Sequence, residues 1–254
     1  CTEWYMQHDS KHLLELSNGK KKLPLTDKKD ILTRCIYGVD IDVHAVEVSK
    51  FSLLIKLIED ETPASVKECV PILPDLSSNI KNGNSLICRE DISGKDMSIE
   101  ALCNIKPFEW SMINSGSRFD AIIGNPPYVK TEDIHTLETE AEFAVYKKKY
   151  KSAYKQFDKY FLFLEEAFNL LKENGQMCYI VPNKFYKIGA GQELRRIISK
   201  HVSKLDDFGD MQLFPDKTIY SCIITLCKES SKQMEYTNVT SLIDLWTGEE
   251  KESI

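Results

Sequence analysis

The sequence has no apolar run long enough to span a bilayer, and its first residues do not form a signal peptide. It contains no internal repeat and no low-complexity tract. We therefore expect neither a membrane nor a secreted protein, and we expect the chain to work in the cytoplasm. The first residue is not methionine, which predicts a piece of something longer.

Metal-binding and disulfide patterns are missing as well. The eight cysteines include no C-x-x-C pair and no zinc-like spacing. Several lie inside apolar runs, as Cys178 and Cys222 do, which is typical of reduced core thiols in a cytosolic protein. We predict no metal site.

An excess of basic residues is also lacking. The formal net charge of -6 argues against a uniformly basic nucleic-acid coat, yet binding needs only a local basic face. One candidate is the group Lys147, Lys148, Lys149 and Lys151, which is interleaved with tyrosines. Such a mixture suits contact with DNA phosphates and stacking on bases, and a solvated helix surface is the alternative.

Strand and helix patterns alternate along the chain. Hydrophobic residues make up 42% of it, enough for one large α/β domain or a domain with an appendage. We expect strands at 35–42, 82–87, 119–124, 177–181, 205–208 and 219–227, and helices at 3–16, 43–60, 158–175 and 193–202. Residues 89–117 read as irregular and residues 129–156 as a polar insertion. The alternation predicts a mostly parallel, doubly wound sheet.

Polar residues stand where several of these strands end. Ligands in doubly wound sheets bind at the carboxyl ends of the strands. Asp40, Asn84 and Asn125 all lie at or near such ends. We therefore expect the functional site along this edge.

The most informative segment is Asn125-Pro126-Pro127-Tyr128, which follows an apolar strand directly. The exocyclic amine of a heteroaromatic base is a poor nucleophile, because its lone pair is delocalised into the ring. The side-chain oxygen of Asn125 and the carbonyl of Pro126 offer two acceptors in a rigid turn for the two N–H bonds. Tyr128 would stack on the base face. The alternative is a turn that merely ends a strand.

Three residues at the first two strand ends are candidates for a nucleoside site. Asp40 is placed to accept hydrogen bonds from ribose hydroxyls, and Ile41 to pack on an adenine ring. Asn84 is placed to hydrogen-bond the amino group of that adenine. The alternatives are acidic capping of the next helix for Asp40 and a turn with Gly83 for Asn84.

Two phenylalanines allow two interpretations each. Phe214 is placed to form a second wall of a base pocket opposite Tyr128, since a base swung out of a duplex must be restacked. An ordinary buried phenylalanine is the alternative. Phe163 reads as core more readily than as a cofactor contact.

Taken together, these motifs resemble the amino-group DNA methyltransferases, and specifically the adenine-specific methylase domain of fused type II restriction-modification enzymes. The segments that carry the resemblance are Tyr37–Asp42, Gly83–Leu86, Asn125–Tyr128, Asp158–Tyr186, Phe208–Asp210 and Phe214-Pro215. Their order and spacing cover most of residues 30–227.

The resemblance implies a Rossmann-like sheet with an antiparallel last strand, S-adenosylmethionine as methyl donor and an adenine of double-stranded DNA as acceptor. No metal is needed for methylation. It further implies a bacterial or archaeal host, a fused nuclease and a target-recognition domain. The residues implied are Asn125, Pro126, Pro127 and Tyr128 for catalysis, Asp40, Ile41, Asn84, Ser85 and Phe163 for the cofactor, Tyr128 and Phe214 for the base, and Lys147, Lys148, Lys149 and Lys151 for the DNA backbone.

One departure from the family concerns its first strand and the glycine-rich turn that follows, which nothing here matches. We expect residues 1–230 to be a catalytic domain that lacks this strand, and residues 231–254 to begin a linker or target-recognition region. We also expect a gap in the sheet between the second and fourth strands, and weak or no cofactor binding by the chain alone.

Two other functions fit the residues. Enzymes that methylate a glutamine amide of release factors resemble this chain at the same tetrapeptide, because an amide nitrogen poses the same chemical problem. A catalytically silent DNA-binding fragment belongs to a different class. It predicts salt-sensitive DNA binding without turnover.

Overall fold

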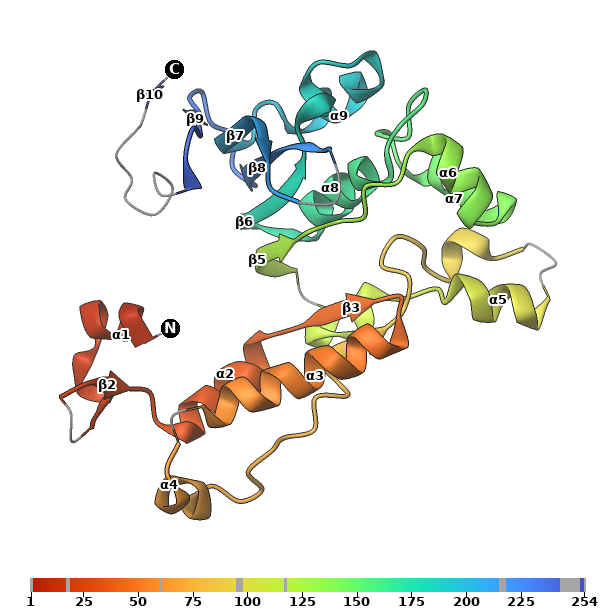
Figure 1. The fold of residues 1–254 in the computed structure, drawn as a ribbon. Helices are drawn as coiled ribbons and strands as arrows, with labels where there is room; N and C mark the ends of the chain where they lie inside the picture. The colour runs from red at the N-terminus through yellow and green to blue at the C-terminus, as the bar shows by residue number, and fades with distance from the viewer. Residues whose placement is uncertain are drawn as a thin grey trace. The chain divides into compact units, whose positions relative to one another are not determined.

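The computed structural model describes residues 2–16, 19–59, 61–94, 98–116, 118–214, 218–242 and 252–253. The chain, coloured in Figure 1 from red at the N-terminus to blue at the C-terminus, divides into two compact units. The first unit is Cys1–Cys88 with Asp96–Ser117, and the second is Arg89–Lys95 with Arg118–Ile254.

The first unit is mainly helical, with two small sheets. Its elements are α1 (Thr2–His8), η1 (Ser10–His12), β1 (Leu14–Glu15), β2 (Lys21–Lys22), α2 (Leu25–Cys35), β3 (Gly38–Asp40), α3 (Val43–Ile58), α4 (Pro63–Glu68), β4 (Ile80–Asn82), α5 (Ile99–Ile105), η3 (Trp110–Met112) and η4 (Asn114–Gly116). Leu32 of α2 and Val46 and Leu57 of α3 are buried in one core with Ile80 of β4. Strands β3 and β4 are parallel, with Asp40 opposite Asn82, so both end at the same edge.

Helix α3 begins where the sequence predicts. The Asp42 side chain accepts a hydrogen bond from the backbone N–H of His44 at 2.9 Å, which satisfies one of the donors that a helix start leaves unpaired. The predicted start of the helix at residue 43 is therefore confirmed, with Asp42 as its N-cap.

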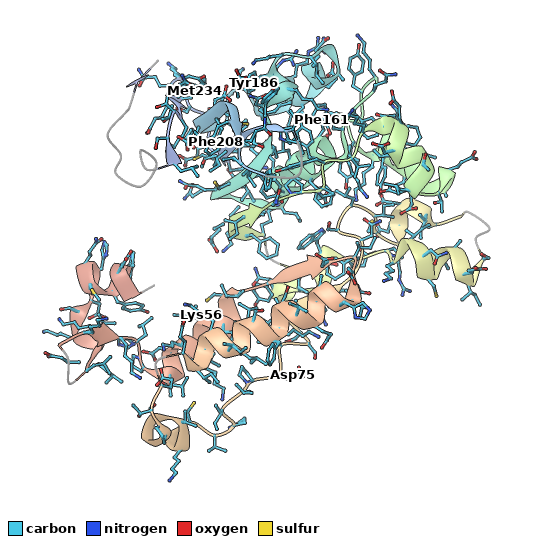
Figure 2. The ribbon with its side chains drawn as sticks, viewed as in Figure 1. Lys56, Asp75, Phe161, Tyr186, Phe208 and Met234 are labelled. Carbon is cyan, nitrogen blue, oxygen red and sulfur yellow. The ribbon has the colours of Figure 1, made fainter. Side chains whose placement is uncertain are left out.

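The second unit is built on a six-stranded sheet. Its elements are η2 (Glu90–Ile92), β5 (Phe119–Gly124), α6 (Thr131–Leu137), α7 (Glu140–Lys149), α8 (Lys159–Leu170), β6 (Leu171–Pro182), η5 (Asn183–Tyr186), η6 (Gly189–Gly191), α9 (Gln192–Ile198), β7 (Val202–Gln212), β8 (Tyr220–Cys227), β9 (Glu235–Asn238) and β10 (Glu252–Ser253). The strand order is β10-β9-β7-β8-β6-β5. Phe161 of α8 and Phe208 of β7, both labelled in Figure 2, are 0% and 3% exposed and belong to the core of this unit.

The pairing in this sheet is mixed rather than mostly parallel. Strand β8 lies between β6 and β7 and is antiparallel to both, whereas β5 with β6 and β7 with β9 are parallel. The predicted antiparallel strand at 219–227 is therefore confirmed, but its central position makes the sheet mixed. Strand β9 lies beyond residue 230 and still extends the sheet.

In the described part of the chain, the strands expected on either side of the gap belong to separate sheets. Strands β3 and β4 form a sheet of their own, and β5 pairs with β6 in the other one. The predicted strands at 35–42 and 119–124, which correspond to the family's second and fourth strands, are thus not hydrogen-bonded to each other.

Several predicted boundaries are wrong. The helix predicted at 3–16 ends at His8, where a short 3₁₀ helix and a hairpin take over, and α2 was not predicted. Residues 89–117 are not irregular throughout, because Ser98 caps α5 through a hydrogen bond from Ala101 N–H. The polar insertion contains α6 and α7.

Gly175 was predicted to end the helix that begins near Asp158. The helix ends at Leu170 instead, and Gly175 lies inside β6. A Cβ atom on Gly175 would come within 2.8 Å of the Phe119 backbone oxygen. The glycine is therefore required by the close approach of β5 and β6.

No helix of the described residues has both the length and the apolar character needed to cross a membrane. The same part of the chain contains no group of three or more His, Cys, Asp or Glu side chains that could hold a metal ion.

Candidate active site

The tetrapeptide lies directly after β5, as predicted. Asn125 and Pro127 are exposed, Pro126 is buried and Tyr128 is half-buried. The Tyr128 hydroxyl donates a hydrogen bond to the Ile180 carbonyl of β6 at 3.0 Å. The turn is thus tied to the neighbouring strand at its far end, which leaves the Asn125 amide accessible to solvent.

The segment after the tetrapeptide is anchored to the start of α8. The backbone N–H of Lys159 donates to the Val129 carbonyl at 2.8 Å, and the Thr131 hydroxyl donates to the Phe157 carbonyl. The buried Asp158 carboxylate pairs with Lys184 of η5 at 2.7 Å. Burial raises the pKa of Asp158, although the Lys184 ammonium acts in the opposite direction. These contacts hold both ends of the turn on rigid elements.

Tyr128 packs against two other aromatic rings. Its ring centroid lies 6.3 Å from that of Tyr160, at an interplanar angle of 78°, and 6.3 Å from that of Phe214, at 70°. Burial, followed by the nearby Cys222, raises the pKa of Tyr128 to about 12, so its phenol is neutral at physiological pH.

The expected pairing of Phe214 with Tyr128 is therefore present, but with a different geometry. An edge-to-face contact leaves no parallel slot for a base between the rings. Pro215, which follows Phe214 in the matching motif, lies outside the described residues.

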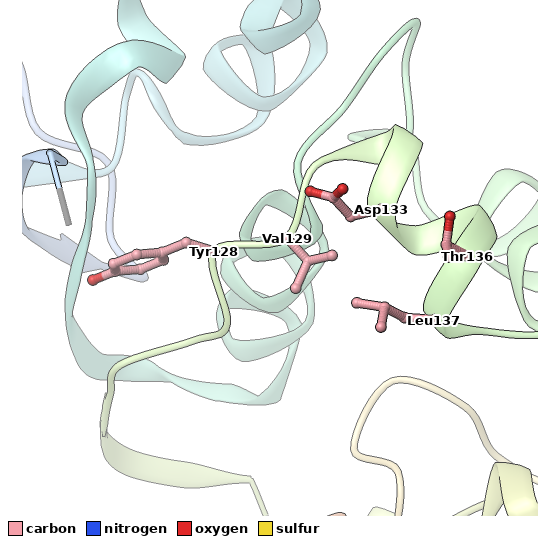
Figure 3. A pocket seen from close by; sticks show the side chains of 5 residues that line it. All are labelled: Tyr128, Val129, Asp133, Thr136 and Leu137. Carbon is pink, nitrogen blue, oxygen red and sulfur yellow. The ribbon is translucent and has the colours of Figure 1, made fainter. Parts of the chain in front are cut away.

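A hollow of about 220 Å³ adjoins the tetrapeptide on the α6 side (Figure 3). Its lining consists of Tyr128, Val129, Asp133, Thr136 and Leu137. Sequence reasoning did not identify the three α6 residues, although their i, i+3, i+4 spacing on a helix just after the motif is a readable signal.

In the first unit, Asp40 is the last residue of β3, and Ile41 follows it. One Asp40 carboxylate oxygen accepts the backbone N–H of Asp42 at 2.8 Å, and the side chain is exposed. Ile41 is 46% exposed, and its carbonyl accepts hydrogen bonds from Lys106 and Asn82. An exposed carboxylate beside an exposed apolar side chain suits a ribose and the base attached to it.

Asn84 lies in a tightly packed turn next to β4. Its side chain is 4% exposed, and its Oδ1 accepts the backbone N–H of Leu86 at 3.1 Å. Its Nδ2 has no partner among the described residues. The unsatisfied atom is a donor, so it suits a ring nitrogen better than the amino group predicted from the sequence.

The turn around Asn84 has no room for adjustment. A Cβ atom on Gly83 would lie 2.8 Å from the Phe108 side chain. The Ser85 carbonyl accepts a hydrogen bond from the Trp110 indole at 2.9 Å. Buried polar groups are nearly always hydrogen-bonded, so the unpaired Asn84 donor in this rigid turn fits a bound heterocycle. Phe163 is in α8 of the second unit and is half-buried.

The lysine cluster separates into two kinds of residue. The Lys147 ammonium donates to the carbonyls of Ala153 and Lys155 at 2.9 and 3.1 Å, and burial lowers its pKa. Lys149 pairs with Asp91 at 2.9 Å. Lys148 and Lys151 are exposed and have no side-chain partner in the part of the chain that the structure describes. Within the cluster, only these two have an ammonium group that no contact among the described residues holds.

Asp207 was also missed by sequence reasoning. Its carboxylate accepts hydrogen bonds from Asn183 at 2.9 Å, from Gly209 N–H at 3.1 Å and from the Tyr186 hydroxyl. Burial alone would raise the pKa of Asp207, but these donors outweigh it and hold the pKa below its ordinary value. The available signal was an acid directly before Phe208 in the segment predicted as a strand at 205–208.

Comparison with known proteins supplies the family. The family model described as Eco57I restriction-modification methylase matches residues 34–214. The chain is 43% identical over 251 residues to the type II restriction enzyme and methyltransferase RM.Eco57I of Escherichia coli, covering 98% of this chain and 24% of that protein. It is 34% identical over 82 residues to the type II methyltransferase M.BstVI of Geobacillus stearothermophilus, covering 32% of this chain and 14% of that protein. The chain thus spans about a quarter or less of these relatives.

Solved structures give the same fold at low sequence identity. A nuclease-deletion mutant of the Type ISP restriction-modification enzyme LlaGI, in complex with a DNA substrate mimic, aligns with a TM-score of 0.60 and 15% identity, covering 91% of this chain and 21% of that one. The DrdV–DNA complex aligns with a TM-score of 0.58 and 15% identity, covering 91% of this chain and 25% of that one.

Proposed function

This chain belongs to the Eco57I restriction-modification methylase family, and from that premise we propose that it transfers a methyl group from S-adenosylmethionine to an adenine amino group in double-stranded DNA. The observation that carries the proposal is the exposed Asn125 amide at the end of β5, in a turn that Tyr128 ties to β6. The methylation would serve a restriction-modification system. RM.Eco57I is named as both restriction enzyme and methyltransferase, so we also propose that a nuclease and a target-recognition domain act with this chain.

The tetrapeptide activates the amine through hydrogen bonding. Asn125 Oδ1 and the Pro126 carbonyl accept hydrogen bonds from the two N–H groups of the flipped adenine's amine. These hydrogen bonds draw the lone pair of the amine nitrogen out of the ring. Both acceptors are preorganised by the two prolines, so they stabilise the positive charge that develops on nitrogen at little reorganisation cost. The amine nitrogen would then displace the sulfonium sulfur from the methyl carbon in line, so that the C–N bond forms as the C–S bond breaks and S-adenosylhomocysteine leaves. The methylated nitrogen would lose one proton to solvent, and no covalent enzyme intermediate would form.

The first unit holds the cofactor. When bound, S-adenosylmethionine supplies a methyl group on a positively charged sulfur. Asp40 would accept hydrogen bonds from the ribose hydroxyls. The exposed Ile41 would cover one face of the adenine, and the unpaired Asn84 Nδ2 would donate to a ring nitrogen. Ser85 belongs to the same turn.

The target base stacks on Tyr128. The phenol stays neutral and hydrogen-bonded, because the pKa of Tyr128 is about 12. Phe214 forms the second wall after turning out of its edge-to-face contact with Tyr128. Lys148 and Lys151 contact DNA phosphates.

Labelled methyl transfer by the intact protein tests this function. Unmethylated plasmid and purified release factor are each incubated with radiolabelled S-adenosylmethionine, and the DNA is digested to nucleosides. We expect label in N6-methyladenine and none with Asn125→Ala. Label in release factor would favour the glutamine methyltransferase, and salt-sensitive DNA binding without any transfer would favour the silent fragment.

A further inference from the structure

The hollow beside the tetrapeptide has its own chemistry. Asp133, Thr136 and Leu137 come from one face of α6, and Val129 from the segment that follows the turn. In Figure 3 the ring of Tyr128 points away from these α6 side chains. The ring face proposed for the target adenine and the hollow therefore lie on different sides of the Tyr128-Val129 segment.

Helix α6 is held rigidly in place. Ile134 on its inner face is 0% exposed, and Glu138 at its end forms an ion pair with Lys159 whose two side chains are 12% and 13% exposed. The Lys159 backbone N–H in turn binds the Val129 carbonyl at 2.8 Å. A wall that is ordered before binding loses little entropy when a ligand enters.

The lining selects a particular kind of group. An ionised carboxylate such as Asp133 only accepts hydrogen bonds and repels phosphate, so it favours the amine edge of a base. Leu137 is 70% exposed, so its apolar side chain is available for contact with a base face. A volume of about 220 Å³ lies below the range of about 300–1,000 Å³ common for drug-sized ligands and suits one planar ring.

We propose that this hollow is a subsite for the base next to the target adenine, and that Asp133 selects a neighbour with an amine on its major-groove edge, adenine or cytosine. The assignment rests on the proposed function and extends it, because it makes α6 a determinant of sequence specificity. Asp133 accepts a hydrogen bond from the amine, Thr136 contacts the same base edge, and Leu137 packs on the ring.

Methylome sequencing tests the assignment and reveals the recognition site in the same experiment. A methylation-deficient host expresses the wild-type protein, Asp133→Ala or Glu132→Ala, and all methylated adenines are mapped. Glu132 is the matched control, because it is an exposed acid on the same turn of α6 that does not line the hollow.

We expect the wild-type motif to require adenine or cytosine at one position beside the methylated adenine. Asp133→Ala should lower discrimination at that position alone by about 5- to 100-fold, and Glu132→Ala should leave the motif unchanged. In vitro, a neighbouring adenine can be replaced by purine, which lacks the amine. This replacement should reduce kcat/KM of the wild-type protein about 10-fold and should change kcat/KM of Asp133→Ala only slightly.

Two results would overturn the assignment: a wild-type motif without adenine or cytosine on either side of the methylated base, or an Asp133→Ala motif identical to wild type. A misfolded variant is recognised by its melting temperature, and the purine substitution in the wild-type protein then decides alone. Failure of the proposed function looks different, because the wild-type protein would then leave no methylated adenine anywhere.

Discussion

The Tyr128 hydroxyl donates to the Ile180 carbonyl oxygen, with 3.0 Å between the two oxygens. This contact joins the end of the tetrapeptide to β6, so the ring is oriented by the sheet rather than by the loop alone. A ring held in this way can receive a base without first being ordered.

The Tyr128 contact predicts different effects for two substitutions. Tyr128→Phe keeps the ring and loses one neutral hydrogen bond, so DNA methylation should fall no more than about 10-fold. Tyr128→Ala also removes the stacking surface, so its methylation rate should be lower by a further factor of about 10 to 100. Single-turnover rates measure both. Equal losses in the two variants would assign the effect to the hydroxyl rather than the ring.

Asn84 predicts which atom meets the cofactor. Asn84→Asp keeps an oxygen for the Leu86 N–H and replaces the unpaired Nδ2 donor by an acceptor. Calorimetry with S-adenosylhomocysteine should show a Kd raised about 10-fold or more. A Kd that is unchanged or lower would mean that Asn84 accepts a hydrogen bond from the adenine amino group.

The lysines near the end of α7 predict separable effects on DNA binding and stability. Lys148→Met removes an exposed charge and should lower the salt dependence of DNA binding by about one unit of slope. Lys147→Met removes the donor to Ala153 and Lys155 and should cost about 1–3 kcal/mol of folding free energy with the slope unchanged. Salt titrations and denaturant unfolding distinguish them. A lower salt slope for Lys147→Met, with the slope of Lys148→Met unchanged, would show that Lys147 contacts the phosphates.

Asp207 predicts a pH dependence of stability. Its folded-state pKa lies below the unfolded value, so the unfolded state binds the proton more tightly. The stabilisation is complete above the unfolded pKa of about 4 and is lost as pH falls through the folded pKa. Asp207→Asn should therefore be less stable at pH 7, by about 2 kcal/mol, and should lose less stability than wild type between pH 5 and pH 3. Parallel curves for the two proteins over this range would contradict this.

Local patterns predicted the part of the site that depends on local structure. The run Phe119–Gly124 has strand character on its own, and Asp42 caps a helix that starts one residue later, so neither requires long-range information. The exposed Asn125 follows from the strand end and the two prolines.

Long-range contacts decided the features that the sequence did not reveal. Glycine is common at helix ends, so Gly175 was expected there. The nearby backbone oxygen of Phe119 in β5 explains why a glycine is needed in β6 instead. Lys147 looks like its neighbours in the sequence, but the loop after α7 folds back, with the backbone N–H groups of Lys151 and Ser152 bound to Glu165. The mixed sheet likewise follows from β8 inserting between two strands that precede it in the chain.

The most direct test of the account is the single-turnover methylation rate of Asn125→Ala in the intact protein, with DNA and S-adenosylmethionine saturating. Asn169→Ala, an exposed asparagine on α8, is the matched control. We expect the rate of Asn125→Ala to be about 100- to 1,000-fold lower than that of wild type, with DNA and cofactor binding retained. The rate of the control should match that of wild type. A rate for Asn125→Ala within about twofold of wild type would contradict the role of this amide in activating the adenine amine.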